Sequence, residues 1–212
     1  MTAVRQSTAL AICLWGMDFL IEKKYIKFIF SILIASLFHK TALIFISAVL
    51  LINRKIKAYP FAFVIIALIL SKYSSSLIFN LINKLFVEQR AEYYLKNSNS
   101  LNYTLLLVNS VILLVTYFIY KQNNEEDFFF NKSYYLVLLG ICFLPFCTII
   151  AEFFRISMYF MVYIIIILPN AIHKLKNKNS KFIYELSLVI IMIIYMIISN
   201  GNNYGVFPYN FL

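Results

Sequence analysis

The feature that most constrains this chain is a succession of long, continuous apolar runs separated by short polar stretches. The runs cover residues 8–21, 28–52, 60–72, 101–120, 134–151, 156–169 and 182–199. Apolar and polar residues do not alternate with a period of two within them, so the pattern is not that of barrel strands. Because 62% of the residues are hydrophobic and 13% are charged, a soluble domain of this size could not cover so much apolar surface.

The runs therefore predict an all-α fold, a single polytopic transmembrane helical bundle of about seven to eight membrane segments that occupies residues 1–212. The run 101–120 has the length that the hydrocarbon core requires, about 20 residues. The runs 8–21, 60–72 and 156–169 are shorter. We expect them to be extended by flanking residues, tilted or partly re-entrant.

The longest run, 28–52, lies between two basic clusters and is interrupted by a polar pair. The clusters consist of Lys23, Lys24, Lys27, Arg54, Lys55 and Lys57. Cytoplasmic loops carry an excess of lysine and arginine, so both clusters are expected on the same side of the membrane. We therefore predict two half-helices, 28–38 and 41–52, that turn at His39 and Lys40 on the outer side. The alternative is one long tilted helix with His39 buried against a neighbour.

With this turn, the predicted loops alternate between the two sides of the membrane. Segments 121–133 and 173–181 fall inside together with the two basic clusters, which places most lysines and arginines in the cytoplasm. Segment 73–100 falls outside, where its mixture of charged, aromatic and aliphatic residues predicts an amphipathic segment at the interface. Topology thus accounts for the formal charge of +10, and we expect no nucleic-acid partner.

Ionisable residues near a membrane are costly to bury, which makes those on the predicted outer side candidates for function. Arg155 comes first, because a guanidinium binds phosphate oxygens in a planar, bidentate way. Its alternative role is to pair with Glu152 at a helix end. Arg5 and Arg90 are further candidate phosphate ligands, with interfacial anchoring as their alternative. His39 and Glu152 are candidate general bases.

Sequence motifs for nucleotide, zinc or serine chemistry are absent: there is no Walker A, HExxH or GxSxG pattern. The cysteines Cys13, Cys142 and Cys147 lie in apolar stretches without metal-ligand spacing. We therefore expect no metal, no other cofactor and no disulfide. The same absences argue against an energy-consuming pump.

Several short motifs resemble the EpsG family of Wzy-like polysaccharide polymerases. In the N-terminal half these are Arg5-Gln6, Glu-Lys-Lys-Tyr-Ile-Lys-Phe at 22–28 and Ile-Ala-Ser-Leu-Phe-His-Lys-Thr-Ala-Leu at 34–43. In the C-terminal half they are Arg-Ile-Ser-Met-Tyr-Phe at 155–160, Leu-Pro at 168–169 and Phe-Pro-Tyr-Asn-Phe at 207–211. Members of that family are generally longer, with additional N-terminal spans. The first span here would begin outside with few residues before it, so we expect the C-terminal portion of a longer protein.

The resemblance implies a multi-pass glycosyltransferase-type polymerase of capsule, exopolysaccharide or O-antigen at the outer face of the bacterial plasma (inner) membrane. Its substrates would be oligosaccharide repeats linked to undecaprenyl pyrophosphate, which leaves when one repeat is transferred onto another. It would work among membrane lipids, with a flippase and a chain-length regulator as partners. Arg155, Arg5 and Arg90 would bind the pyrophosphate, and Glu152 or His39 would accept the proton of the acceptor hydroxyl.

Three alternatives remain open. A flippase or transporter of the same lipid-linked oligosaccharide would share the outer basic residues but should show inverted repeats, which we do not detect. A membrane acyltransferase would need a catalytic histidine with a buried polar partner, and His39 alone supports that interpretation. An inactive polymerase fragment would keep the family motifs without the activity.

Overall fold

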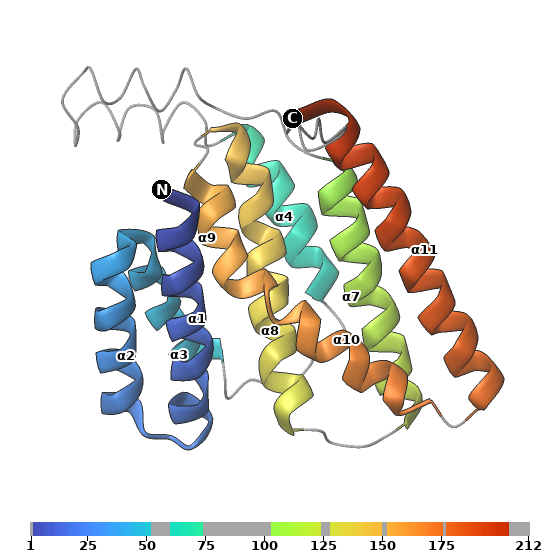
Figure 1. The fold of residues 1–212 in the computed structure, drawn as a ribbon, viewed down its shortest axis with the longest axis horizontal. Coiled ribbons are helices and arrows are strands. Elements are labelled where there is room, and N and C mark those ends of the chain that lie inside the picture. Colours follow the sequence, from blue (N-terminus) through green and yellow to red (C-terminus); the bar gives the residue numbers. More distant parts are fainter. Residues whose placement is uncertain are drawn as a thin grey trace, which may run out of the picture.

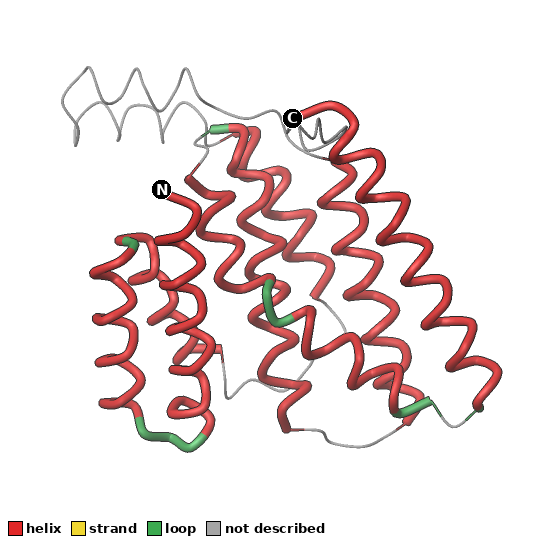
Figure 2. Tube along the Cα trace, viewed as in Figure 1, coloured by secondary structure: helices red, strands yellow, loops and turns green. Residues whose placement is uncertain are grey.

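The computed structural model describes residues 2–51, 60–73, 103–123, 128–149, 152–175 and 177–203. All regular secondary structure in these residues is helical (Figures 1 and 2). In chain order the helices are α1 (Thr2–Ile21), α2 (Tyr25–Phe38), the 3₁₀ helix η1 (Lys40–Ser47), α3 (Ala48–Leu51), α4 (Pro60–Tyr73), α7 (Tyr103–Asn123), α8 (Phe128–Phe143), the 3₁₀ helix η2 (Leu144–Thr148), α9 (Glu152–Met161), α10 (Ile164–His173) and α11 (Lys178–Asn203).

The helices follow the apolar runs of the sequence. Within the described residues, Phe153–His173 is the one stretch that is long and apolar enough to cross a membrane. Its 21 residues would rise about 31 Å as a continuous helix. Shorter apolar helices cover Tyr25–Phe38, Lys40–Leu51, Ala62–Tyr73, Leu105–Lys121 and Ser133–Cys147. The predicted all-α class is thus confirmed. The predicted amphipathic segment 73–100 lies outside the described residues, apart from its first residue.

The run 28–52 forms a hairpin and not one long helix. Helix α2 ends at Phe38, and His39 takes an extended backbone conformation with φ −149° and ψ 114°. The 3₁₀ helix η1 then runs back along α2 (Figure 1). The second half differs from the expected α-helix, because eight of its residues adopt the tighter 3₁₀ form. At about 2.0 Å per residue this form reaches further than an α-helix of equal length, which suits a short segment.

Successive passes through the bundle run in opposite directions, with η1–α3 and α9–α10 each forming one pass, so the helix ends collect at two ends of the molecule (Figure 1). Helix α1 begins, α2 ends and α9 begins at one of them, which we call the His39 end. The loop 22–24, the last turn of α7 and the loop from α10 to α11 lie at the other, which we call the Lys23 end. Described basic residues at the Lys23 end are Lys23, Lys24, Lys27, Lys121, Lys174 and Lys181. This alternation agrees with the predicted loop topology.

The centre of the N-terminal half is an aromatic cluster around Phe45 of η1. Its ring lies 5.3 Å from that of Phe160 and 6.1 Å from that of Phe28, measured between centroids. Tyr163 stacks on the same ring at 6.0 Å, with an interplanar angle of 2°. All four side chains are buried. The cluster fixes η1 between α2 and the junction of α9 with α10.

Two glycines allow close helix contacts, as small residues commonly do between membrane helices. A Cβ atom at Gly16 of α1 would overlap the hydroxyl of Ser31 on α2. A Cβ atom at Gly140 of α8 would lie 2.7 Å from Cγ of Met161 and 3.0 Å from its backbone nitrogen. Helix α9 therefore packs directly on the backbone of α8.

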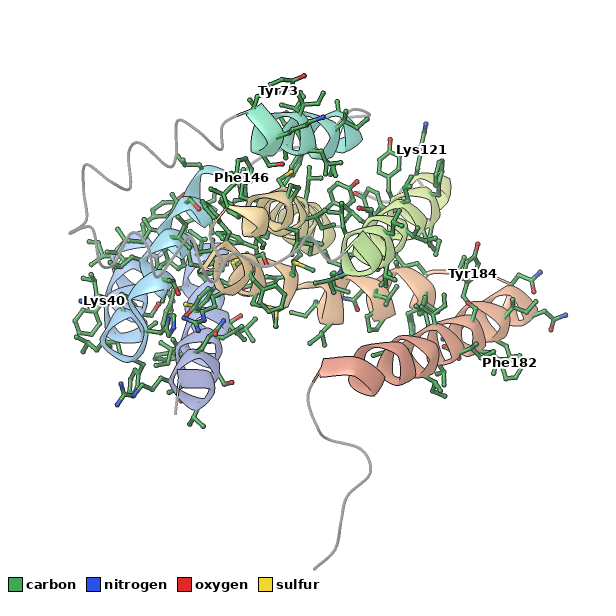
Figure 3. All side chains as sticks on the ribbon, turned by 90° about the horizontal axis from the view of Figure 1, so that it is seen from above. Lys40, Tyr73, Lys121, Phe146, Phe182 and Tyr184 are labelled. Atoms are coloured by element: carbon green, nitrogen blue, oxygen red, sulfur yellow. The ribbon has the colours of Figure 1, made fainter. Side chains whose placement is uncertain are left out.

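Large apolar side chains cover the outward faces of several helices. On α4, Phe63 and Ile65 are 57% and 58% exposed. Helix α11 stands at one side of the bundle, and its labelled side chains Phe182 and Tyr184 project from it (Figure 3). Most described side chains of α11 are exposed, among them Met192 at 68%. Apolar surfaces of this extent need an apolar surrounding or a partner.

Candidate functional site

The candidate site lies at the His39 end, where α1, η1 and α9 pack against one another. A hydrogen bond joins the first turns of two of these helices: Nε2 of Gln6 on α1 donates to the backbone oxygen of Arg155 on α9, at 3.4 Å. Gln6, near the start of the chain, therefore helps to position Arg155, which is the first candidate for phosphate binding in the sequence analysis. We call Gln6, His39, Thr41, Arg155 and Tyr159 the α1–η1–α9 site.

His39 enters this site at the turn between α2 and η1. Its Nδ1 lies 2.6 Å from Oγ1 of Thr41, two residues later, and which atom donates depends on the imidazole tautomer. The backbone nitrogen of Ala42 also donates to the carbonyl oxygen of His39. The backbone nitrogen of His39 donates to the carbonyl oxygen of Ala35, which satisfies one of the groups that the end of α2 leaves over. The contact with Thr41 helps to orient the imidazole.

Helix α9 presents Arg155 and Tyr159 on one face, because residues four apart are neighbours on a helix. The Arg155 side chain is half-buried, and that of Tyr159 is buried. The buried hydroxyl of Tyr159 lies beside the Thr41 side chain, which also contacts Nδ1 of His39.

The described charged side chains at this end are cationic. Arg5 and Lys40 are exposed here, and Lys40 points away from the bundle (Figure 3). Among described side chains, the carboxylates belong to Asp18 of α1, Glu22 of the loop 22–24 and Glu185 of α11, all nearer the Lys23 end. Cationic side chains attract anions, and guanidinium groups bind phosphate oxygens in particular.

The five residues predicted from sequence meet different outcomes. Arg155 and His39 both lie at the His39 end, Arg155 on α9 and His39 at the turn before η1, and α9 packs on η1. Arg5 lies beside Gln6 in the first turn of α1 and is exposed. Glu152 is the first residue of α9, one turn before Arg155, but its side chain lies outside the described part of the chain. Arg90 also lies outside the described residues.

The sequence reasoning missed Gln6, Thr41 and Tyr159 as members of the site. The spacing offered a signal, since Tyr159 follows Arg155 by four residues on one helix and Thr41 follows His39 by two. Both positions also lie inside the motifs 34–43 and 155–160 that carried the family resemblance. Nothing in the sequence alone indicates that Gln6 meets α9, 149 residues further along the chain.

Comparison with known proteins supports one family. The model of the EpsG family matches residues 1–211. No protein of curated function and no solved structure gives a significant match to this chain. The family match covers nearly the whole sequence, and the resemblance drawn from the short motifs is thereby confirmed. The chain belongs to the EpsG family.

Proposed function

We propose that this chain is a polytopic protein of the bacterial plasma membrane with its His39 end facing outward. The apolar helices and the exposed apolar side chains of α4 and α11 support a lipid surrounding. The lysines at the Lys23 end support the orientation, because cytoplasmic loops are enriched in positive charge.

Within that membrane the proposed activity is polymerisation of lipid-linked oligosaccharide repeats for capsule, exopolysaccharide or O-antigen. Membership of the EpsG family supports a polymerase-like role in polysaccharide biosynthesis. The substrate would be an oligosaccharide joined to undecaprenyl pyrophosphate, shared with a flippase that delivers it and a regulator of chain length. The sugar–pyrophosphate bond would itself supply the free energy of transfer.

The observation that carries this proposal is the position of Arg155. It lies half-buried at the His39 end, on a helix that packs against the 3₁₀ helix that follows His39. In the proposed reaction the bond between the anomeric carbon and the pyrophosphate breaks, and negative charge develops on the departing oxygen. A fixed guanidinium stabilises that charge more in the transition state than in the ground state, which is the requirement for catalysis.

The acceptor sugar must lose a proton as its hydroxyl oxygen attacks the anomeric carbon. His39, whose Nδ1 lies 2.6 Å from Oγ1 of Thr41, would take that proton as the general base. Glu152 remains the other candidate base, because it begins the helix that carries Arg155. Arg5 and Arg90 would add positive charge along the path of the pyrophosphate.

The proposal is tested by deleting the gene and analysing the surface glycan and its lipid-linked precursors. A polymerase deletion should leave single repeats on the lipid carrier at the outer face, and the wild-type gene should restore long chains. Long chains in the deletion strain would contradict the proposal. Complete loss of outer repeats would instead indicate the flippase alternative.

A further inference from the structure

An open apolar groove runs between α1 and α2 on the side of this hairpin that faces away from the bundle. Its volume is about 320 Å³, and its lining includes Trp15, Phe19, Lys27, Phe30, Ser31 and Ile34. Ligand pockets in proteins hold about 300–1,000 Å³, so the groove is large enough for part of a lipid. It contains no residue of the α1–η1–α9 site.

Helix packing gives the groove a defined shape. Gly16 brings α1 against Ser31, which lies buried at the floor. Trp15 and Phe19, one turn apart on α1, form one wall, with ring centroids 5.0 Å apart in an edge-to-face arrangement. Phe30 of α2 is 63% exposed on the opposite side. The groove is therefore held open by the backbone contact and by a rigid aromatic pair.

The lining changes in character along the groove. Lys27 lies two residues into α2, about 3 Å from its start, whereas Phe30 and Ile34 lie about 8 and 14 Å from it. The cation therefore stands at the mouth near the loop 22–24, and the apolar residues lie deeper in the bundle. A phospholipid has the same order, with a charged headgroup at the surface and acyl chains beneath it.

The loop at this mouth carries excess positive charge. Lys24 forms an ion pair with Glu22, and Lys23 and Lys27 add two further cations. Lys23 occupies the left-handed region with φ 60°, in a Schellman motif whose bonds run from Lys23 N to Leu20 O and from Lys24 N to Phe19 O. This position favours glycine. A lysine held there against the backbone preference points to a use for its charge.

We propose that the groove binds an anionic phospholipid of the leaflet at the Lys23 end, with one acyl chain against Trp15, Phe30 and Ile34 and the headgroup phosphate at Lys27 and Lys23. Lysines near a membrane surface attract anionic lipids in general, so a lipid bound in the groove is distinguished by its dependence on Lys27, which lines the groove. The inference rests on the membrane placement proposed above and is independent of the polymerase reaction.

The test is native mass spectrometry of the purified full chain, titrated with phosphatidylglycerol or phosphatidylcholine. We expect the wild type to retain phosphatidylglycerol in preference to phosphatidylcholine. Each basic residue near a membrane surface strengthens anionic-lipid binding about fivefold, so Lys27→Gln should weaken phosphatidylglycerol binding by about that factor. Lys27→Arg should retain it. Glycerol phosphate without acyl chains should not bind, because the groove supplies the apolar contacts.

Two further variants separate charge at the groove from general effects. Lys121→Gln removes an exposed lysine at the same end on α7 and should weaken phosphatidylglycerol binding less than Lys27→Gln, because Lys121 does not line the groove. Lys23→Gly relieves the left-handed backbone, so it should melt at a higher temperature than the wild type while losing part of the lipid preference. Equal binding of both lipids by the wild type would overturn the proposal. So would an equal loss in Lys121→Gln and Lys27→Gln, or a partner protein occupying the groove instead of lipid.

Discussion

Replacing Gly16 by alanine tests whether α1 and α2 touch as the structure shows. An added Cβ would overlap Oγ of Ser31 and lie 3.3 Å from its Cβ. The hydroxyl cannot turn away freely, because it donates to the backbone oxygen of Phe28 at 2.7 Å. Either that bond breaks or the two helices separate.

The expected size of the effect follows from two opposing contributions. Overpacking in a close contact costs about 1–3 kcal/mol, whereas exchanging glycine for alanine inside a helix gains about 1 kcal/mol. Gly16→Ala should therefore change stability by between about zero and 2 kcal/mol in the destabilising direction. Ser31→Gly removes both crowded atoms, so the double variant should recover the overpacking contribution. The coupling energy between the two sites should be about 1–3 kcal/mol and favourable.

The measurement is a double-mutant cycle on the purified chain, unfolded by titration with a denaturing detergent. Trp15, the single tryptophan, reports on the α1–α2 contact through its fluorescence, and circular dichroism provides a second probe remote from the substitutions. Effects of the two substitutions that add within about 0.5 kcal/mol would refute the contact, since residues that do not touch show no such coupling.

Three further predictions follow from other contacts. At Gly140→Ala the overpacking cost of about 1–3 kcal/mol is offset by about 1 kcal/mol of helix propensity, so the net change in the same detergent titration should be about zero to 2 kcal/mol destabilising. Trimming Met161 should not fully remove the overpacking cost, because the backbone nitrogen at 3.0 Å remains. A gain in stability for Gly140→Ala would contradict the α8–α9 packing. Thr41→Val removes the partner of His39 Nδ1 and should slow polymer formation about fivefold at equal protein level, whereas an unchanged rate would remove Thr41 from the mechanism. The pKa of Glu22 is lowered from 4.5 by its hydrogen bond and ion pair with a neighbouring lysine. The small stabilisation of the folded chain is therefore present above pH 4.5 and lost as the pH falls below it. Glu22→Gln should abolish this pH dependence of stability in thermal melts between pH 3 and 7, roughly the range that brackets carboxylate titration.

Much of the fold was accessible from sequence because its determinants are local. Apolar runs and lysine clusters predict which segments are helical and which loops share a side, and the helices follow them. The turn at His39 was also predictable, since a polar pair interrupts an apolar run between two basic clusters. The 3₁₀ form of η1 was not, because it depends on how Phe45 packs against α2 and α9, which no local pattern encodes.

The candidate site was predictable only in part. Arg155 and His39 stood out because charged and titratable side chains are rare among apolar runs. Gln6 did not, because its contact with α9 joins segments 149 residues apart. Tyr159 was one aromatic residue among many in the sequence, and the position of its buried hydroxyl beside Thr41 becomes visible only in three dimensions.

The most direct test of the proposed function is the length of the surface polysaccharide made by cells that carry variants of Arg155. With equal amounts of protein in the membrane, Arg155→Ala should leave mainly single repeats, because loss of one preorganised group at a developing charge costs about 100- to 1,000-fold in rate. Arg155→Lys should give short chains, since lysine keeps the charge without the bidentate fork. Lys72→Ala, an exposed cation at the end of α4, should give wild-type chains. Wild-type chain length in Arg155→Ala would contradict the role of this arginine at the centre of the site.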